Sequence, residues 1–524
     1  MTSLLNRVLA SAQRFPDRPA IHDGQPTSYR GLLTRTRRIA AALPPAGSGP
    51  ALGALLVRRD ATGYAALLAT AWSGRAYVPL NPGYPLRRTI AMLRASGADT
   101  LIVDGAAGAD LDRLLGALPD PLTVVLVGAG ERTPEAARHR VVRVDPDSGD
   151  LTRRDPADQA AGLAYLLFTS GTTGTPSGVP VHGASVSAYL DAVAARHDLG
   201  PHDRASQTFE LTFDLSVHDM FATWQAGACL YPLPQRALLQ PLTFIRRHEL
   251  SAWFSVPSVA ARADALGVLG AGVLPSLRWS LFCGEPLTRR LATAWQSAAP
   301  AATLDNLYGP TEATIAITGF QPATDTGAAP DTNGVLPIGR PFAGQRAAVM
   351  AGGEPVPPGA VGELWLSGSQ VTTGYWADPE RTAARFATRP DGHWFRTGDL
   401  VRQDPSGCLH YHGRTDDQLK INGFRVELLE VDHVLRTACD APDALVVPWP
   451  GAAAPQYLVA VVARGGDRSP KQIIEACAES LPSYMVPRRV TVVDDIPRNP
   501  NGKLDRKAAA ALLEEEGSHE TVSG

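Results

Sequence analysis

Apolar residues gather in short runs that alternate with segments of helical periodicity over most of the chain. Runs at 54–57, 101–103, 124–127 and 163–168 predict buried strands, and segment 63–72 predicts a helix. Because strands and helices follow one another in this way, we expect an α/β fold with mixed sheets and packed helices.

Further elements are expected in the last hundred residues. Segment 418–425 favours a strand and a turn, 426–435 a helix, and 458–462 and 490–493 two further strands. This arrangement is typical of a small α+β domain. The tail over 513–524, where three consecutive acids precede small polar residues, is expected to be disordered.

Two further segments are expected to be structural. Residues 131–159 are polar and charged, which favours a surface connection. Residues 362–368 have an alternating pattern, which predicts a strand that serves as scaffold.

Composition excludes several classes of function. The chain has 524 residues, 44% of them apolar and 19% charged, with a formal net charge of −3. This balance is that of a globular protein without a basic face for nucleic acid or for an anionic membrane. No apolar run reaches the length of a bilayer span, and the first residues lack the pattern of a signal peptide. The scattered cysteines, without metal-like spacing, fit reduced thiols in a cytoplasm: Cys229, Cys283, Cys408, Cys439 and Cys477.

Lysine is rare. Of the 49 basic residues, only four are lysines: Lys420, Lys471, Lys503 and Lys507. No lysine occurs before residue 420. Each retained lysine is therefore a candidate for a chemical role, although Lys471 and Lys507 are also suited to an exposed surface.

A loop rich in glycine and hydroxyl side chains follows the apolar run 163–168. It reads Thr-Ser-Gly-Thr-Thr-Gly-Thr-Pro-Ser-Gly over 169–178. Glycine lets backbone N–H groups approach a phosphate closely, and hydroxyls donate to its oxygens. No Gly-Lys-Ser/Thr closes the loop, so it is not a Walker A motif. Taken alone, it is also compatible with an ordinary surface turn.

Four more motifs follow in order. They are Tyr-Gly-Pro-Thr-Glu-Ala at 308–313, Phe-Arg-Thr-Gly-Asp at 395–399, Gly-Arg-Thr-Asp at 413–416 and Asn-Pro-Asn-Gly-Lys at 499–503. Together with the loop, this set resembles the adenylate-forming superfamily, which includes amino-acid adenylation domains of nonribosomal peptide synthetases, acyl-CoA synthetases and luciferases. The resemblance covers the chain from about Phe15 to about Lys507.

The resemblance implies ATP and Mg²⁺ as cofactors. It assigns Asn306 to the adenine edge, Tyr308 to stacking on the ring and Asp399 to the ribose hydroxyls, with Glu312 as a catalytic group that holds Mg²⁺. Core packing is the alternative for Tyr308. The implied ATP-binding set is Thr169, Ser170, Gly171, Thr172, Thr173, Gly174, Asn306, Tyr308, Thr311, Asp399, Tyr411 and Arg414.

An acid pocket is implied around Phe-Asp-Leu-Ser-Val-His-Asp-Met at 213–220. In amino-acid-activating members the residue matching Asp214 holds the substrate ammonium; a helix N-cap is the alternative and is compatible. The implied lining is Asp214, Leu215, His218, Phe254, Leu281, Cys283, Leu307, Ile315 and Ala316. This lining is almost wholly apolar and disfavours charged side chains. His218 is a pocket wall or a packed imidazole, and Cys283 is a small wall group rather than a nucleophile.

The pocket motifs are most similar to those of D-alanine–carrier protein ligases. That similarity implies a small aliphatic amino acid, alanine first, without fixing its chirality. A free-standing amino-acid adenylation enzyme of the nonribosomal-peptide type is therefore expected. No carrier motif follows the last domain, so the acceptor is expected to be the phosphopantetheine thiol of a separate carrier protein.

The C-terminal motifs carry the remaining implied roles. Lys503 would bridge the carboxylate and the α-phosphate as a catalytic cation; with Arg498 and Lys507 it also fits a solvated basic turn. Asp416 would be the hinge of domain rotation, because Gly-Arg-Thr-Asp at 413–416 resembles the hinge of the superfamily. The resemblance thus implies a large N-terminal domain over 1–415 and a small mobile C-terminal domain over 416–512. Lys420 and Gly423 would then form the face used for thiolation.

One departure leaves alternatives open. Ser177 stands where the superfamily usually carries lysine in the phosphate loop, which removes one charge-assisted contact. A degenerate carrier-binding partner is one alternative function. An acyl- or aryl-CoA synthetase is another, but Asp214 argues against it because such acids offer no ammonium.

Overall fold

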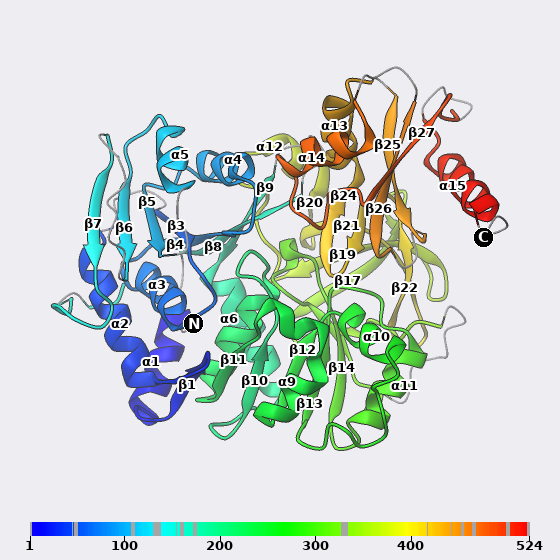
Figure 1. The fold of residues 1–524 in the computed structure, drawn as a ribbon. Helices are drawn as coiled ribbons and strands as arrows, with labels where there is room; N and C mark the ends of the chain where they lie inside the picture. Colours follow the sequence, from blue (N-terminus) through cyan, green and yellow to red (C-terminus); the bar gives the residue numbers. More distant parts are fainter. Residues whose placement is uncertain are drawn as a thin grey trace. The chain divides into compact units, whose positions relative to one another are not determined.

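The structure is a computed structural model, and Figure 1 draws its fold. It describes residues 3–44, 46, 51–105, 110–128, 138–152, 155–157, 162–170, 176–325, 334–416, 418–441, 443–451, 455–463, 468–498 and 504–520. The chain divides into two compact units. The first comprises Met1–Pro82, Leu93–Phe168 and Gly178–Thr415, and the second comprises Gly83–Met92, Thr169–Ser177 and Asp416–Gly524.

A seven-stranded sheet is built from the first half of the chain. Its order is β7 (Arg140–Val144), β6 (Thr123–Val127), β5 (Thr100–Asp104), β3 (Leu52–Leu56), β4 (Ala76–Leu80), β8 (Leu163–Thr169) and β9 (Ser177–His182). The pairs from β7 to β8 are parallel. The connections carry α2 (Tyr29–Ala42), α3 (Ala61–Trp72), α4 (Leu86–Ser96) and α5 (Asp110–Gly116). The predicted strands and the predicted helix 63–72 all fall on these elements.

Strand β7 corrects one expectation. Residues 131–159 were expected to form a connection alone, yet Arg140-Val-Val-Arg-Val144 pairs with β6 as an edge strand. Two arginines accompany its three valines, and such charged residues on an edge strand hide the apolar signal of the strand.

A nine-stranded sheet forms the centre of the first unit. Its order is β16 (Arg340–Pro341), β15 (Thr318–Phe320), β14 (Thr303–Tyr308), β13 (Trp279–Phe282), β12 (Ala252–Ser255), β10 (Arg204–Gln207), β11 (Cys229–Pro232), β1 (Pro19–His22) and β2 (Pro26–Ser28). The inner strands are parallel, and the strands at each end pair antiparallel. Its helices are α1 (Leu4–Arg14), α6 (Gly183–Arg196), α7 (Leu215–Val217), η1 (His218–Ala222), α8 (Thr223–Gln225), η2 (Gln235–Leu239), α9 (Pro241–His248), α10 (Pro257–Ala265) and α11 (Arg289–Ala298).

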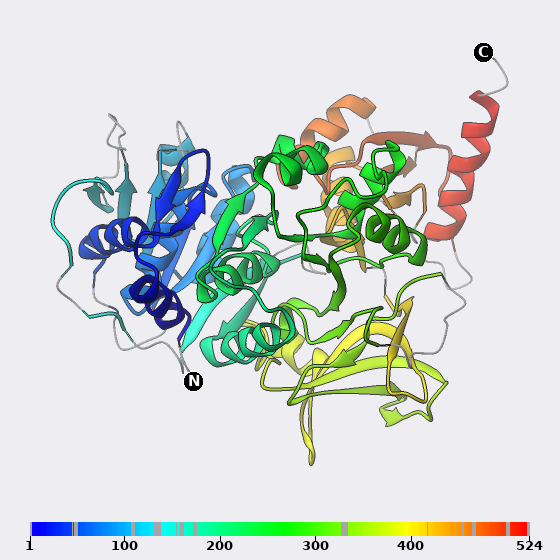
Figure 2. The same ribbon diagram turned by 90° about the horizontal axis from the view of Figure 1, so that it is seen from below.

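The last part of the first unit is an antiparallel sheet, drawn in yellow and yellow-green in Figure 2. It joins β18 (Glu354–Pro355), β17 (Gln345–Ala351), β19 (Val361–Gly368), β21 (Gly392–Gln403) and β20 (Phe386–Arg389), with β22 (Leu409–Arg414) paired to β21. Helix α12 (Pro379–Arg385) precedes β20, and the short helix η3 (Thr311–Ala313) follows β14.

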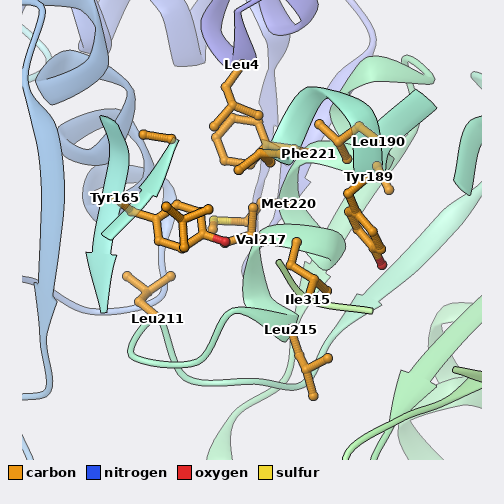
Figure 3. Packing of buried hydrophobic residues seen from close by; sticks show 14 of the residues in the cluster. Leu4, Tyr165, Tyr189, Leu190, Leu211, Leu215, Val217, Met220, Phe221 and Ile315 are labelled. Atoms are coloured by element: carbon orange, nitrogen blue, oxygen red, sulfur yellow. The ribbon is translucent and has the colours of Figure 1, made fainter. Parts of the chain in front are cut away.

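One apolar cluster packs the elements of the first unit together. Figure 3 shows part of it, including Tyr165 of β8, Met220 and Phe221 of η1, and Leu4 of α1. Leu215 and Ile315, both predicted pocket residues, belong to the same cluster. The predicted pocket wall is therefore continuous with the main core.

The second unit has its own sheets and core. Strands β23 (Gln418–Ile421) and β24 (Phe424–Glu427) form a hairpin, and β25 (Ala444–Trp449), β26 (Tyr457–Ala463) and β27 (Arg489–Val493) form a three-stranded sheet. The hairpin turn is Asn422-Gly423, with φ of 50° and 84°, the residues that best tolerate a turn with two positive φ angles. The helices are α13 (Leu428–Cys439), α14 (Pro470–Ala478) and α15 (Arg506–Glu520).

Helix α15 corrects the expected disordered tail over 513–524. The helix continues to Glu520, and Leu513 is buried in a cluster with Ile496 and Ala509. Alanines and leucines at 508–513 are strong helix formers, and burying Leu513 anchors that segment. Residues 521–524 lie outside the described residues.

Two general expectations can be compared with the described residues. Within the ranges given above, no helix has the length and apolar character needed to cross a membrane. All five cysteines are free and buried.

Candidate functional site

The predicted pocket wall begins at the carboxyl ends of three neighbouring parallel strands. Phe254 of β12 lies opposite Leu281 of β13, and Leu281 lies opposite Asp305 of β14. Cys283 follows β13 directly, and Leu307 lies near the end of β14. In open α/β sheets, ligands bind beyond the carboxyl ends of the strands. The sheet topology thus brings together side chains that are more than 50 positions apart in the sequence.

The segment after β10 supplies Asp214, Leu215 and His218. Asp214 occupies the N-cap position of α7, but its side chain makes no capping hydrogen bond there. Its carboxylate is 7% exposed, and it raises the pKa of the buried hydroxyls of Tyr77, Tyr165 and Tyr189, for which burial is the larger cause. The Asp214 carboxyl group therefore lies within a region of aromatic side chains.

His218 opens η1, a π-helical turn, a geometry that occurs often at functional sites. Its Nδ1 lies 2.7 Å from the Tyr189 hydroxyl of α6, and its ring packs edge-on against Phe254 at 4.7 Å between centroids. Burial, with a smaller contribution from His197, lowers the pKa of His218 to about 3. His218 is thus a neutral imidazole that packs and hydrogen-bonds, which agrees with the alternative of a packed imidazole, and its place in the pocket wall stays a prediction.

The opposite part of the wall is a turn with unusual backbone angles. Thr314 and Ile315 have φ of 55° and 74°, a region that β-branched residues rarely occupy. Holding such a residue there costs roughly 1–3 kcal/mol. Ile315 and Ala316 are nevertheless fully buried. Backbone carbonyls of this turn accept hydrogen bonds from the buried amide of Gln370.

Glu312 lies in η3, immediately before that turn, and is fully buried. Its Oε1 accepts a hydrogen bond of 2.6 Å from the Tyr375 hydroxyl, and its backbone carbonyl accepts from Thr372 N–H at 2.9 Å. Carboxylate oxygen is a ligand that Mg²⁺ prefers, so this side chain fits the role of a metal ligand.

Tyr308, Asp399 and Arg414 form a buried hydrogen-bonded set. The Tyr308 hydroxyl donates to Oδ2 of Asp399, and Arg414 Nη1 donates to Oδ1 at 2.5 Å. Arg414 also donates to the Thr397 carbonyl at 3.1 Å. Burial and then the Asp399 charge raise the pKa of Tyr308, and Tyr411 of β22 contributes to the same shift.

Tyr308 is the last residue of β14 and is 8% exposed. Its side chain is therefore packed, which agrees with the alternative of core packing, and stacking on adenine stays a prediction.

Other members of the predicted ATP-binding set are placed as follows. The Asn306 side-chain amide donates to the Pro337 carbonyl at 2.8 Å, and Thr311 begins η3. Thr169 ends β8 and its hydroxyl lies 3.5 Å from the Ser177 carbonyl, with Ser170 next in the chain. Gly171, Thr172, Thr173 and Gly174 lie outside the described residues.

The roles predicted in the C-terminal motifs fall on the second unit. Asp416 is its first residue in this part of the chain, and its carboxylate accepts from Gln418 N–H at 3.4 Å. Lys420 lies in β23 and Gly423 in the hairpin turn. Lys503 lies outside the described residues.

Several residues that support the site were not found from the sequence. Tyr189, Gln370 and Tyr375 contact it across separations of 29, 54 to 57 and 63 residues. Only Tyr375 had a local signal, a Gly-Tyr pair shortly after a scaffold strand. Asp305 is a further case: burial opposes its ionisation, but hydrogen bonds from His197 and Arg196 lower its pKa overall.

A second group of potential metal ligands lies in the β21–β22 turn. Asp404, Cys408 and His410 place one candidate atom each within 4.8 Å of the others. Asp404 Oδ1 already accepts from the backbone of Ser406 and Cys408, and Oδ2 lies 3.0 Å from His410 Nε2. These hydrogen bonds within the turn account for the closeness of the three side chains.

The comparison with protein families decides to which family the chain belongs. Residues 8–376 match the AMP-binding enzyme family, and residues 430–503 match the AMP-binding enzyme C-terminal domain. The chain belongs to the AMP-binding enzyme family. The resemblance to the adenylate-forming superfamily and the α/β fold predicted from the sequence are therefore confirmed.

Individual relatives of this AMP-binding enzyme align over nearly its whole length. The L-proline–[L-prolyl-carrier protein] ligase of Pseudomonas fluorescens is 33% identical, over 98% of this chain and 100% of the ligase. AMB antimetabolite synthetase AmbB of Pseudomonas aeruginosa is 34% identical over 95% of this chain, which spans only 38% of that synthetase. The crystal structure of the Vibrio cholerae adenylation domain AlmE with glycyl-adenosine-5′-phosphate is 33% identical, with 98% of both chains covered and a TM-score of 0.88.

Proposed function

We propose that this AMP-binding enzyme activates a small aliphatic amino acid, alanine first, as aminoacyl-AMP. The aminoacyl group then passes to the phosphopantetheine thiol of a separate carrier protein. The proline ligase relative supports an amino-acid substrate and a carrier acceptor, and the glycyl-adenylate held by AlmE supports a small side chain.

The position of Asp214 is the observation that carries the proposal. Its buried carboxylate directly precedes Leu215, which belongs to the same apolar cluster as Phe254 and Leu281. A substrate ammonium would offer this carboxylate an opposite charge and hydrogen-bond donors, both of which stabilise a buried charge. The wall offers no charged group to a substrate side chain, so a small apolar one fits best.

The first step joins two anions. An oxygen of the amino-acid carboxylate attacks the α-phosphorus of ATP, a new P–O bond forms, and the bond to the pyrophosphate oxygen breaks. Charge repulsion and alignment dominate this barrier. Lys503 would lower it by bridging the carboxylate and the α-phosphate.

The nucleotide would be held by groups of the first unit. Asp399 would accept from the ribose hydroxyls, with Arg414 fixing its orientation. Glu312 would hold Mg²⁺, which supplies charge neutralisation at the phosphates when bound. Tyr375 orients the Glu312 carboxylate through their hydrogen bond of 2.6 Å.

In the second step a carrier thiolate attacks the acyl carbon. A thioester forms, and AMP leaves with the electron pair of the broken C–O bond. Rotation of the second unit at Asp416 would withdraw Lys503 and present Lys420 and Gly423 to the carrier.

ATP–pyrophosphate exchange tests the proposal. The panel would contain the common L-amino acids, D-alanine, β-amino acids, and fatty and aryl acids. Exchange with alanine, glycine or serine alone supports both the class and the pocket; a different amino acid keeps the class and rejects the pocket assignment. Exchange only with acids that lack an amine favours a CoA synthetase, and no exchange favours a degenerate carrier-binding partner.

Variants of Asp214 sharpen that result. Asp214→Asn should raise the Michaelis constant of the amino acid about 100-fold, because a neutral amide cannot neutralise the ammonium, while the constant for ATP changes little. An unchanged amino-acid constant would reject the ammonium role.

A further inference from the structure

The turn at 314–316 departs from the conformations that its residues prefer. Thr314 and Ile315 are β-branched, yet both have positive φ. Glycine at either position would adopt these angles freely. Surrounding contacts must therefore hold the turn in place.

The backbone at Gly309 passes very close to the turn. A Cβ on Gly309 would lie 2.6 Å from the Ala316 Cα and 2.9 Å from the Ile315 carbonyl oxygen. Ile317 N–H also donates to the Tyr308 carbonyl at 2.8 Å. The turn is thus folded back on the end of β14, which leaves it little freedom to relax in that direction.

Gln370 is the principal polar contact on the turn. Its Nε2 lies 2.7 Å from the Ala316 carbonyl, 3.2 Å from that of Thr314 and 3.4 Å from that of Ala313. Three acceptors around one nitrogen fix the orientation of the amide. In return, the Thr314 hydroxyl donates to the Gln370 carbonyl at 2.5 Å.

Gln370 is itself held rigidly. It is fully buried, and its backbone N–H donates to Oε1 of Gln345 at 3.2 Å. Gln345 Nε2 in turn donates to the Ser369 hydroxyl at 3.0 Å. The amide therefore reaches the turn from a fixed support next to β19.

We propose that Gln370 is a positioning residue that holds the 314–316 turn in its strained form, so that Ile315 and Ala316 complete the amino-acid pocket. Without its amide, three buried carbonyls lose a shared donor and the turn relaxes toward ordinary backbone angles. The wall then moves, although Gln370 itself touches no substrate. The amino-acid specificity of this role rests on the proposed function.

The same support serves two separate parts of the site. Gln370 contacts the turn, whereas Tyr375, five residues later, contacts the Glu312 carboxylate. Removing the Gln370 amide should therefore affect amino-acid binding more than ATP use, and removing the Tyr375 hydroxyl should do the reverse.

The test compares Gln370→Met with Gln296→Met. Methionine keeps the volume and removes the donor. Gln296 is a matched control because its Nε2 also donates to two backbone carbonyls, those of Ala299 and Ala302, after α11. We expect Gln370→Met to raise the amino-acid Michaelis constant at least tenfold in pyrophosphate exchange, with the ATP constant within about threefold of wild type. Equal increases in both constants, or none, would overturn the proposal.

Hydrogen exchange measured by mass spectrometry gives a readout that needs no activity. Amides of Ala313, Thr314 and Ile317 are hydrogen-bonded within this region and report on the turn. Their exchange should be at least tenfold faster in Gln370→Met and unchanged in Gln296→Met. If the wild type activates no amino acid, the proposed function fails, and these rates alone decide the positioning role; unchanged rates would reject it.

Discussion

His218 is kept uncharged by its surroundings. Burial lowers its pKa from the ordinary 6.5 to about 3, and its Nδ1 remains paired with the Tyr189 hydroxyl. Between these two pH values the unfolded chain binds a proton that the folded chain does not. The contribution of His218 to stability is therefore complete above pH 6.5 and declines as the pH falls toward 3.

Replacing His218 should remove this part of the acid sensitivity. Between about pH 7.5 and about pH 5, the wild type should lose roughly 2 kcal/mol more unfolding free energy than His218→Gln. Urea denaturation at both pH values measures the difference. His202→Gln, at an exposed position, should keep the wild-type pH dependence. Equal pH dependence in wild type and His218→Gln would contradict the neutral assignment.

Lys503 and Lys471 offer a second comparison of single residues. Lys471 is an exposed surface residue, with 86% side-chain exposure and an ion pair to Glu475. Lys503→Ala should slow pyrophosphate exchange by about 10²–10³-fold or more, since a preorganised cation is lost, and leave the melting temperature unchanged. Lys471→Ala should leave both unchanged. Exchange in Lys503→Ala at the wild-type rate would exclude its catalytic role.

At the scale of elements, one carboxylate links three strands. Asp399 of β21 accepts from Tyr308 of β14 and from Arg414 of β22. The Asp399 and Arg414 side chains are only 9% and 15% exposed. The strand that carries Leu307, a predicted pocket residue, is thereby tied to the antiparallel sheet.

Breaking this link should be costly. Asp399→Asn keeps the shape but leaves the Arg414 guanidinium buried without its counter-charge, which should cost about 2–3 kcal/mol of unfolding free energy. Asp110→Asn, which breaks the exposed pair with Arg113, should cost less than about 0.5 kcal/mol. Chemical denaturation compares the two, and similar losses would show that the Asp399 link is no stronger than a surface pair.

The elements also show how far the sequence alone can predict. Strands β3, β5 and β8 were evident because a parallel strand buried on both faces reads as a continuous apolar run. Strand β7 and the end of α15 were missed, since an edge position tolerates arginine and an acidic segment masks a helix. The roles of Tyr189 and Gln370 depend on contacts between distant segments, which no local pattern records.

At the scale of the whole molecule, the cysteines are uniformly protected. All five are buried, and burial raises the pKa of Cys229 to about 12 and of Cys408 and Cys477 to about 11. Only a thiolate reacts readily, so burial and a raised pKa both suppress reactivity.

Thiol titration should reflect this protection. Native protein should react with a disulfide reagent at fewer than about one thiol per chain within minutes, and all five should react in denaturant. Pre-treatment with a reductant should change neither value. Rapid reaction of several thiols in the native protein would show that the described packing opens readily.

The two units differ in their lysine content, which makes them chemically distinguishable. The first contains arginine but no lysine, and every lysine of the chain lies at or beyond residue 420 in the second. An amine-directed fluorophore would therefore attach to side chains of the second unit alone. It would report the surroundings of that unit without an engineered attachment point, and its attachment to Lys503 would at the same time stop pyrophosphate exchange.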